Sequence, residues 1–355
     1  MTRRAVRGRD QAVGGGGDHR HTRPSASTTH DDDDDDGGVV GDAARGGAAD
    51  DVPISASLYG PERLAFVLSR VVSLPRRPIR PDDLAPYDQL HYEGTRRLLA
   101  FLRDAQAAFG GDAASARVRV LDIGAGIGGP ARAISGHLGS AGAVDAIDIR
   151  DDLCDCHRRL NDLVGIDSAT IRVVQGDILG TALRGEYDIM VAQLVFLHIA
   201  DKAQLFRQVH QGLRPGGRIY IEDYVACDGA ADNDDDQGML RDSVGVPARS
   251  LLTRGQYEDA LAAQAMRIVQ WDDCTSAWSA FVWERAERFL ADADGLQGTH
   301  PAMFQAMAHF YTTTAKLLRH DIDADLYPKT RARIGPGWVP APVSIRGVAI
   351  VAVAL

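Results

Sequence analysis

Acidic side chains and glycines follow the predicted strands at positions where they could hold a cofactor. Within residues 120–130, Gly124 and Gly126 carry no Cβ, so a ligand can approach the backbone there closely. Together with Gly129 they satisfy G-x-G-x-x-G, a pattern found in the dinucleotide sites of nicotinamide dehydrogenases. Asp122 argues against a dinucleotide, because its carboxylate would repel a pyrophosphate but can receive a cationic ammonium group.

Two further acidic residues complete a set that fits a nucleoside. Asp148 ends the second predicted strand, where its carboxylate can accept hydrogen bonds from both ribose hydroxyls. Asp177 follows the third strand, where it can accept the adenine amino group while Ile178 flanks the ring. Each residue alone could be part of a turn or a helix cap. Their common place at strand ends indicates a nucleoside-bearing cofactor.

The spacing of apolar residues predicts the elements that must position this set. Strands are expected at 118–123, 144–149, 171–174, 187–192, 218–222, 267–270 and 343–355. Helices are expected at 62–72, 95–109, 130–138, 153–164, 202–213, 256–265 and 279–292. Asp201 is the predicted N-cap of the helix that follows it, and an acidic loop is expected after Cys227. Strands that alternate with helices pair in parallel through right-handed crossovers, so we predict an α/β fold with a doubly wound sheet.

Four segments are expected along the chain. Residues 1–52 contain a run of aspartates and few large apolar side chains, so we expect a disordered tail. Their acidic character argues against a targeting peptide. Residues 53–110 are expected to form an N-terminal helical lid and residues 111–227 the cofactor-binding core. Residues 228–355 should supply helices that cap the substrate and the last strands of the sheet.

Composition disfavours several classes of partner. The net charge of −10 over 355 residues disfavours a nucleic-acid or anionic-membrane surface. Four cysteines are too few for a disulfide framework and fit the reducing cytoplasm. The longest apolar run, residues 347–355, is too short to cross a bilayer. Cys154 and Cys156 diverge on a helix, so no metal site is expected. These points favour a small-molecule substrate and leave the oligomeric state open.

The glycine-rich turn at 120–130, Asp148, residues 176–178 and the turn at 213–218 resemble those of the class I S-adenosylmethionine-dependent methyltransferases. The resemblance implies S-adenosyl-L-methionine as the cofactor. It also implies a seven-stranded Rossmann-like sheet with an N-terminal helical lid and a C-terminal helical insertion. The cofactor-binding residues that it implies are His91 (with Leu90, facing the methionine part), Asp122, Gly124, Gly126, Asp148, Ile149, Asp177, Ile178 and Gln193.

A finer similarity, to the phosphoethanolamine, sarcosine and dimethylglycine N-methyltransferases, lies in the segments 193–199, 201–206 and 221–224. It implies a catalytic role for His198, whose ordinary pKa lies near physiological pH. Tyr59 is the first candidate for its catalytic partner, and Tyr92 is the other. The similarity also places Tyr92 and Tyr224 at the substrate.

Two departures from that group concern the acceptor. Leu194 stands where the phosphoethanolamine enzymes carry an aspartate, and their phosphate clamp is largely missing from residues 247–251, which keep Arg249. One planar guanidinium suits a carboxylate, so we expect the acceptor to be a small amino or thioether acid. Sarcosine, dimethylglycine and a methylthio-hydroxybutyrate on a route to dimethylsulfoniopropionate all qualify. Phosphoethanolamine N-methylation and a non-catalytic S-adenosylmethionine-binding protein are the alternatives.

Overall fold

The computed structural model describes residues 59–75, 77–89, 91–109, 117–227, 234–247, 250–295, 300–318, 324–335 and 345–355. The predicted tail, residues 1–52, and the predicted ligand contacts Leu90 and Arg249 lie outside these residues.

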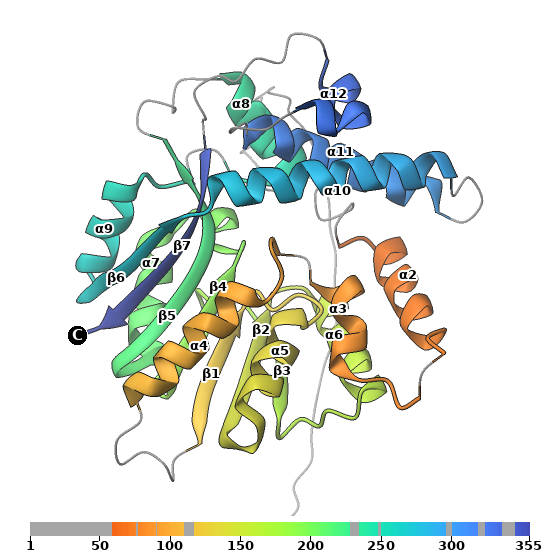
Figure 1. The fold of residues 1–355 in the computed structure, drawn as a ribbon. Helices are drawn as coiled ribbons and strands as arrows, with labels where there is room; N and C mark the ends of the chain where they lie inside the picture. Colours follow the sequence, from red (N-terminus) through yellow and green to blue (C-terminus); the bar gives the residue numbers. More distant parts are fainter. Residues whose placement is uncertain are drawn as a thin grey trace, which may run out of the picture. The chain divides into compact units, whose positions relative to one another are not determined.

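A seven-stranded mixed sheet with the strand order β3-β2-β1-β4-β5-β7-β6 lies at the centre of the described fold (Figure 1). Its strands are β1 Val118–Ile123, β2 Gly142–Asp148, β3 Ile171–Gln175, β4 Tyr187–Gln193, β5 Leu213–Ala226, β6 Met266–Asp273 and β7 Ile345–Ala354. The first five pair in parallel, whereas β7 runs antiparallel to both β5 and β6. The predicted doubly wound seven-stranded sheet is confirmed.

The strand order reverses at β1, because β2 and β3 lie on one side of this strand and β4 and β5 on the other. Such a switch point opens a crevice at the carboxyl ends of the strands that flank it. Asp122 lies near the end of β1 and Gln193 is the last residue of β4. The topology therefore brings the predicted cofactor residues to one edge of the sheet.

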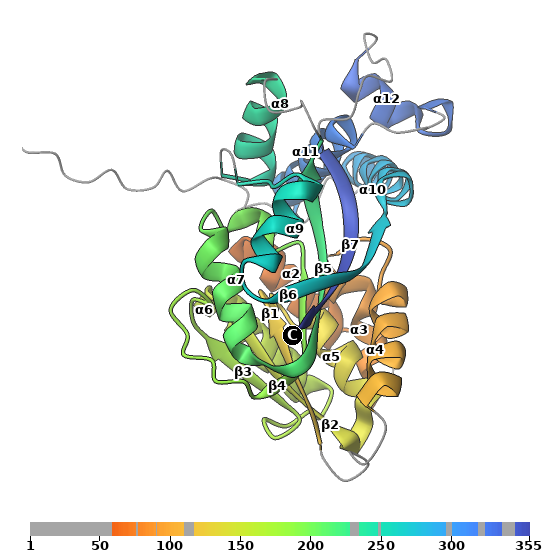
Figure 2. The ribbon, with the colours of Figure 1, turned by 90° about the vertical axis from the view of Figure 1, so that its left-hand side faces the viewer.

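Helices cover both faces of the sheet, with α4 and α5 on one side and α7 on the other (Figure 2). The α-helices are α2 Pro61–Val72, α3 Pro81–Asp88, α4 Arg96–Phe109, α5 Gly129–Leu138, α6 Asp151–Leu163, α7 Lys202–Gly212, α8 Asp234–Met239, α9 Arg254–Ala262, α10 Thr275–Gly295, α11 Pro301–Leu317 and α12 Pro328–Ile334. Shorter turns are η2 Gly139–Ala141, η3 Phe196–His198, η5 Leu240–Val244 and η6 Ala324–Leu326. Leu98 and Leu102 of α4 belong to the apolar cluster on one face of the sheet, and Phe206 of α7 to the cluster on the other. None of the described helices combines the length and apolar character that crossing a bilayer requires.

The structure contains helices that the sequence patterns did not predict, namely α3, α8, α11 and α12. Prolines interrupt the helical spacing of α3, but Pro81 occupies the start of the helix, where a missing N–H is harmless. The acidic loop expected after Cys227 is wrong in part, because α8 begins with a run of aspartates. Acidic residues at a helix N-terminus are stabilised by the helix dipole. The predicted N-cap is confirmed, since the Asp201 carboxylate accepts a hydrogen bond from the Gln204 N–H at 2.9 Å.

A buried ion pair joins the N-terminal helices to the helix that follows the glycine-rich turn. The Arg132 guanidinium of α5 lies 2.9 Å from the Asp88 carboxylate at the end of α3, and both side chains are almost inaccessible to solvent. Arg132 also donates to Asn161 Oδ1 on α6 at 2.8 Å. A Cβ on Gly129 would lie 2.3 Å from the Asp88 carbonyl oxygen. The segment before residue 91 is therefore held against the start of α5. That α2 to α4 form a lid stays a prediction.

Candidate functional site

A cavity of about 390 Å³ opens at the carboxyl ends of β1, β2 and β4, within the usual size range of small-molecule sites. The predicted site residues in its wall are Tyr59, Tyr92, Gly124, Gly126, Asp148, Ile149, Asp177, Ile178, His198 and Tyr224. Three other predicted cofactor residues, His91, Asp122 and Gln193, are buried rather than part of the wall. The cavity thus brings together most of the site predicted from sequence, with Arg249 outside the described residues.

The glycine-rich turn at the cavity needs its glycines for conformation and for space. Gly124 has φ +65°, and a Cβ there would lie 2.4 Å from a methyl carbon of Val195. Gly128 has φ +86°, and a Cβ there would lie 2.1 Å from the His157 ring. L-residues with a side chain rarely adopt such positive φ values. A side chain at either position would strain the backbone and force the turn or the neighbouring side chain to move.

Asp148, at the end of β2, presents a carboxylate that is fixed by the backbone. Its Oδ2 accepts a hydrogen bond from the Gly126 N–H at 2.8 Å, and its Oδ1 accepts one from the Arg150 N–H at 3.0 Å. Burial raises the pKa of the Asp148 carboxyl above its ordinary value, although both backbone bonds oppose this. Each oxygen keeps a lone pair for a ligand. Two acceptors fixed side by side in a cavity wall match the hydroxyls of a ribose.

A row of polar side chains crosses the same edge of the sheet on one face. Asp122 pairs with Val191 in register, and Gln193 lies two residues further along β4, so both side chains point to the same face. Gln193 pairs with Glu222 of β5, and its Nε2 donates to Glu222 Oε2 at 2.8 Å. Burial raises the pKa of Glu222 to about 7. Sequence reasoning missed Glu222, although its period-2 spacing from Tyr224 places the two on one face.

Three buried acceptor atoms in this region have no hydrogen-bond partner among the described residues. They are Asp122 Oδ2, Gln193 Oε1 and His91 Nε2. The other ring nitrogen of His91 hydrogen-bonds to the Gly94 backbone, and burial lowers the pKa of His91 to about 4, so Nε2 is an acceptor at physiological pH. Burial and, next, the Asp148 charge raise the pKa of Asp122 to about 8. Unsatisfied buried acceptors are costly, and a ligand with several N–H donors, such as an ammonium group, would satisfy them.

His198 lies in the short turn η3 after β4 and lines the cavity. Its Nδ1 lies 2.8 Å from the Gly245 carbonyl oxygen. Because a carbonyl only accepts, Nδ1 donates and Nε2 is left as an acceptor. Desolvation by surrounding residues lowers the pKa of His198 below its ordinary value and the Lys202 charge lowers it further, although the side chain stays accessible to solvent. This direction favours the neutral ring, in which Nε2 keeps its lone pair.

The turn that carries His198 is held by two charged side chains that sequence reasoning missed. The Asp223 carboxylate accepts a hydrogen bond from the Leu197 N–H at 3.2 Å. The Lys202 ammonium donates to the carbonyl oxygens of Phe196, at 2.7 Å, and Ile199. Burial raises the pKa of Asp223 to about 7. Asp223 follows Glu222 directly, so the two side chains point to opposite faces of β5. Glu222 belongs to the row of polar side chains, and Asp223 faces η3.

Aromatic side chains form another part of the cavity wall. The hydroxyls of Tyr92 and Tyr224 lie 2.5 Å apart and form a hydrogen bond. Trp278 of α10 packs edge-on against both rings, at centroid distances of 5.0 and 5.9 Å. Tyr59 shares this wall, and burial raises the pKa of its hydroxyl. Tyr59 and Tyr92 thus line the same cavity as His198, which leaves both candidates for its partner in place.

No group of three or more His, Cys, Asp or Glu side chains within the described stretches is arranged to hold a metal ion. Burial raises the pKa values of Cys154 and Cys156 to about 11. Both thiols are therefore protonated at physiological pH.

The strand order defines a Rossmann-like α/β domain. Residues 121–219 match the family model described as a methyltransferase domain, so the chain contains such a domain. The predicted resemblance to the methyltransferases is confirmed.

Curated relatives lie in the group that the sequence pattern predicted. A dimethylglycine N-methyltransferase of Parasynechococcus marenigrum (strain WH8102) is 29% identical over 160 residues, which cover 44% of this chain and 54% of that protein. A phosphoethanolamine N-methyltransferase of Plasmodium falciparum (isolate 3D7) is 25% identical over 181 residues, covering 48% of this chain and 65% of that protein. The chain thus matches between half and two thirds of the length of these two relatives.

Solved structures share the fold. A protein described as a sarcosine dimethylglycine methyltransferase from Galdieria sulphuraria aligns with a TM-score of 0.58 at 18% identity, covering 82% of this chain and 97% of that one. Phosphoethanolamine N-methyltransferase 2 of Haemonchus contortus aligns with a TM-score of 0.59 at 15% identity, covering 85% of this chain and 59% of that one. At these identities the alignments support the fold alone.

Proposed function

We propose that the protein transfers a methyl group from S-adenosyl-L-methionine to a small amino or thioether acid. The observation that carries this proposal is the set of three unpartnered acceptors, Asp122 Oδ2, Gln193 Oε1 and His91 Nε2, beside a cavity whose wall contains Asp148. These groups fit the two polar ends of this cofactor, an ammonium and a ribose. Asp177 and Ile178 in the same wall suit an adenine.

The bound cofactor would supply an electrophilic methyl group on a sulfonium sulfur. The residues of the chain would bind the two reactants in line and exclude water from them, which supplies most of the acceleration in such a displacement. The apolar part of the wall, including Leu194, Leu197 and Phe310, excludes water. The glycine-rich turn allows close approach of the cofactor to the backbone.

His198 has the properties of a proton acceptor in this cavity. Its neutral ring is fixed by the Gly245 carbonyl, and Nε2 keeps its lone pair. An amine must lose a proton to become a nucleophile or after it attacks, and His198 Nε2 can take that proton directly or through one water. A thioether has no proton to lose, so His198 would then only orient the acceptor. Tyr59 or Tyr92 would share the orienting role.

The charges in the wall favour a carboxylate over a phosphate. Arg150 is the one Lys or Arg among the described residues of the wall, and it is already bonded to Asp152 and to the Tyr59 carbonyl. A phosphate carries close to two charges and needs several donors. A carboxylate needs only one or two guanidinium groups, and Arg249 stays a predicted contact for it. We also place the protein in the cytoplasm, with no nucleic-acid or membrane partner, on its acidic charge and few cysteines.

A radiolabelled-methyl transfer assay tests the proposal. The acceptor panel is phosphoethanolamine, glycine, sarcosine, dimethylglycine and a methylthio-hydroxybutyrate, and an acid is expected to be methylated. For an amine acceptor, His198→Ala should lower kcat by about 100-fold or more, the usual scale for loss of a general base. For a thioether the loss should be small.

His210→Ala, in the last turn of α7 and outside the cavity, is the matched control and should leave kcat unchanged. Turnover of phosphoethanolamine alone would overturn the acceptor assignment. Binding of S-adenosylmethionine without transfer to any acceptor would favour the non-catalytic alternative.

A further inference from the structure

The segment that carries His198 leaves β4 in a strained conformation. Leu194 directly follows β4 and has φ +56°, a left-handed value that a bulky side chain rarely adopts. Its N–H donates to the Glu222 carbonyl oxygen of β5 at 2.7 Å. Such strain persists only where the surrounding structure holds the backbone in place. The position of His198 therefore depends on what holds residues 194–198.

Asp223 of β5 holds this segment from the interior of the protein. Its side chain is almost inaccessible to solvent, and its Oδ1 accepts a hydrogen bond from the Leu197 N–H at 3.2 Å. The next two N–H groups, of His198 and Ile199, donate to backbone carbonyls of residues 195 and 196 at 3.0 Å each. The Leu197 N–H is thus fixed by a side chain from another strand, whereas its neighbours are fixed within the turn itself.

The same carboxylate oxygen also holds a second part of the cavity wall. Asp223 Oδ1 accepts a hydrogen bond from the Tyr224 N–H at 2.9 Å. Leu197, His198 and Tyr224 all line the cavity. Because one oxygen atom is bonded to the backbone of both segments, Asp223 sets the separation between the turn that carries His198 and the end of β5 that carries Tyr224.

The second oxygen of the carboxylate is held by helix α9. Asp223 Oδ2 accepts a hydrogen bond from the Tyr257 hydroxyl at 2.8 Å. Tyr257 is fully buried, and its ring packs edge-on against Phe206 of α7 at a centroid distance of 5.5 Å. A carboxylate with both oxygens bonded in a packed interior cannot rotate freely. Asp223 is therefore a fixed support for the two N–H groups.

Two further contacts complete the support of His198. The Lys202 ammonium donates to the Phe196 carbonyl oxygen at 2.7 Å, so a cation holds a carbonyl of the turn while Asp223 holds an N–H. The His198 ring is fixed separately, by Nδ1 against the Gly245 carbonyl oxygen at 2.8 Å. The ring can keep this bond, with Nε2 directed elsewhere, only while the backbone of the turn stays in place.

We propose that Asp223 is a positioning residue for methyl transfer, because its bonds to the Leu197 and Tyr224 N–H groups hold His198 Nε2 at the methyl acceptor. This inference rests on the proposed function, in which His198 acts on the acceptor. Asp223 does not line the cavity, so it acts through the two wall segments to which it is bonded. A displacement of about 1 Å can cost about 100-fold in rate.

Steady-state kinetics with an amine acceptor give the first test. Asp223→Ala removes the shared oxygen and should lower kcat by about 100-fold. Asp223→Asn keeps an oxygen that can accept from both N–H groups, so it should restore most of kcat. Calorimetry should show wild-type affinity for S-adenosylhomocysteine in both variants, since the bonds of Asp223 lie on the His198 side. Equal losses of kcat in the two variants would overturn the proposal.

A double-mutant cycle tests whether Asp223 acts through His198. In the His198→Ala background, Asp223→Ala should have little further effect on kcat, because the group that it positions is already gone. If Asp223→Ala lowers kcat as strongly in that background as in the wild type, Asp223 does not position His198 and the proposal is overturned.

Nitrogen-15 NMR of the histidine rings tests the positioning without methyl transfer, with His198→Ala assigning the signal. His198 should carry its proton on Nδ1 in the wild type and Asp223→Asn, and should populate both tautomers in Asp223→Ala. Asp145→Ala is the matched control, because Asp145 is also buried and also accepts a tyrosine hydroxyl at 2.8 Å, but lies outside the cavity wall. It should keep the wild-type tautomer. An unchanged tautomer in Asp223→Ala overturns the positioning role, whereas absent methyl transfer in the wild type counts against the proposed function.

Hydrogen exchange of the wild type decides the matter if Asp223→Ala fails to fold. The Leu197 amide should be protected as strongly as the amides of His198 and Ile199, whose acceptors are backbone carbonyls. Exchange of the Leu197 amide at the rate of an unfolded chain would show that Asp223 does not hold the turn, and would overturn the proposal.

Discussion

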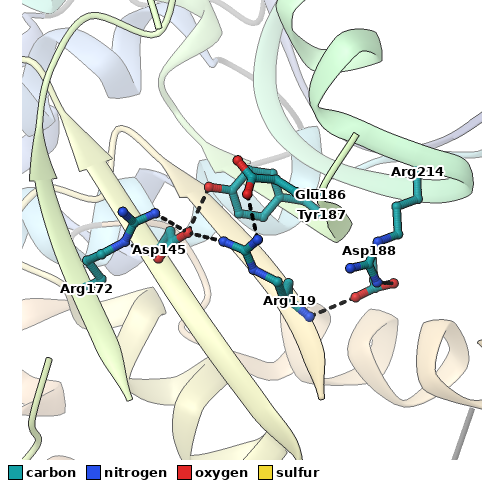
Figure 3. A network of polar contacts seen from close by, with 7 residues as sticks. All are labelled: Arg119, Asp145, Arg172, Glu186, Tyr187, Asp188 and Arg214. Atoms are coloured by element: carbon teal, nitrogen blue, oxygen red, sulfur yellow. Dashed lines mark hydrogen bonds and ion pairs between the residues drawn. The ribbon is translucent and has the colours of Figure 1, made fainter. Parts of the chain in front are cut away.

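Asp145 and Asp148 belong to the same strand, β2, but their surroundings are opposite. The Asp145 carboxylate accepts hydrogen bonds from Arg119 at 3.0 Å, from Arg172 at 2.7 and 2.8 Å and from the Tyr187 hydroxyl at 2.8 Å (Figure 3). Burial would raise its pKa, but the hydrogen bonds and the two arginine charges hold the pKa below its ordinary value. Asp148 has two backbone donors, and burial raises its pKa.

The contrast extends to the two ends of the sheet. Figure 3 shows the network of Asp145 continuing through Arg119 to Glu186 and through Asp188 to Arg214, so that each acid meets a cation. At the carboxyl end, Asp122 and Glu222 have raised pKa values, to about 8 and 7. Charges that are balanced within the protein hold strands together, whereas charges left unbalanced at a cavity are available to a ligand.

The largest expected effect is on stability and concerns Asp145, whose negative charge is balanced by arginines. Asp145→Ala should lower the free energy of unfolding by about 2–4 kcal/mol, because it leaves two arginines and the buried Tyr187 hydroxyl without their acceptor. Since the folded-state pKa of Asp145 lies below the unfolded value, its stabilisation is present at neutral pH and is lost as pH falls through the folded-state pKa. Urea denaturation at pH 7 measures the effect. Asp155→Ala removes the exposed pair with Arg158 and is the control, with little change expected. Equal effects of the two variants would contradict the comparison.

The next effect is on cofactor affinity and concerns Asp148, at the carboxyl end of the sheet. Asp148→Ala should weaken binding of S-adenosylmethionine by about 1.5–3 kcal/mol, the cost of losing charge-assisted hydrogen bonds to the ribose. Its free energy of unfolding should fall far less than that of Asp145→Ala, because Asp148 balances no buried cation. Isothermal titration calorimetry measures the affinity, with the exposed Asp151→Ala as the control. Unchanged affinity would remove the ribose assignment.

The pH dependence of stability tests Asp122, which lies at the same carboxyl end of the sheet. The pKa of Asp122 is raised to about 8, so the native state binds the proton more tightly than the unfolded chain does. Stability should therefore fall as pH rises from the ordinary carboxyl pKa toward 8, and Asp122→Asn should remove this contribution.

Binding of an ammonium beside Asp122 should also release a proton near pH 7. Calorimetry of S-adenosylhomocysteine in buffers of different ionisation enthalpy measures the release, which Asp122→Asn should abolish. Identical proton release by the wild type and the variant would show that Asp122 does not meet the ammonium.

The smallest effect is expected from the N-terminal tail. Deletion of residues 1–52 should leave the thermal midpoint and the cofactor affinity nearly unchanged, because the segment has few apolar side chains to bury. Differential scanning calorimetry checks this. A fall of many degrees would mean that the tail packs on the rest of the chain and stabilises it.

Much of the carboxyl-end site was predictable from local patterns. A buried strand followed by glycines places Asp122, and the same rule places Asp148 and Asp177, because parallel strands bring their carboxyl ends to one edge. The helices α3 and α11 were not predicted. The prolines of α3 obscure its periodicity. The sequence of α11 does carry a helical signal, because Pro301 stands at its first position and Met303, Met307 and Phe310 follow at helical spacing, so this helix could have been predicted.

By itself, the sequence determined the α/β class, the order of the strands, the helices between β1 and β5 and the identity of the acids at the strand ends. These depend on period-2 and period-3.6 spacing and on glycine conformation, which act between near neighbours. Only the tertiary structure decided which of these carboxylates are paired with arginines. It gave Asp145 two arginines and, within the part of the chain that the structure describes, gave the Asp148 carboxylate only backbone donors. The reason is physical, because burial and charge at one atom are set by residues far apart in the chain that come together only on folding.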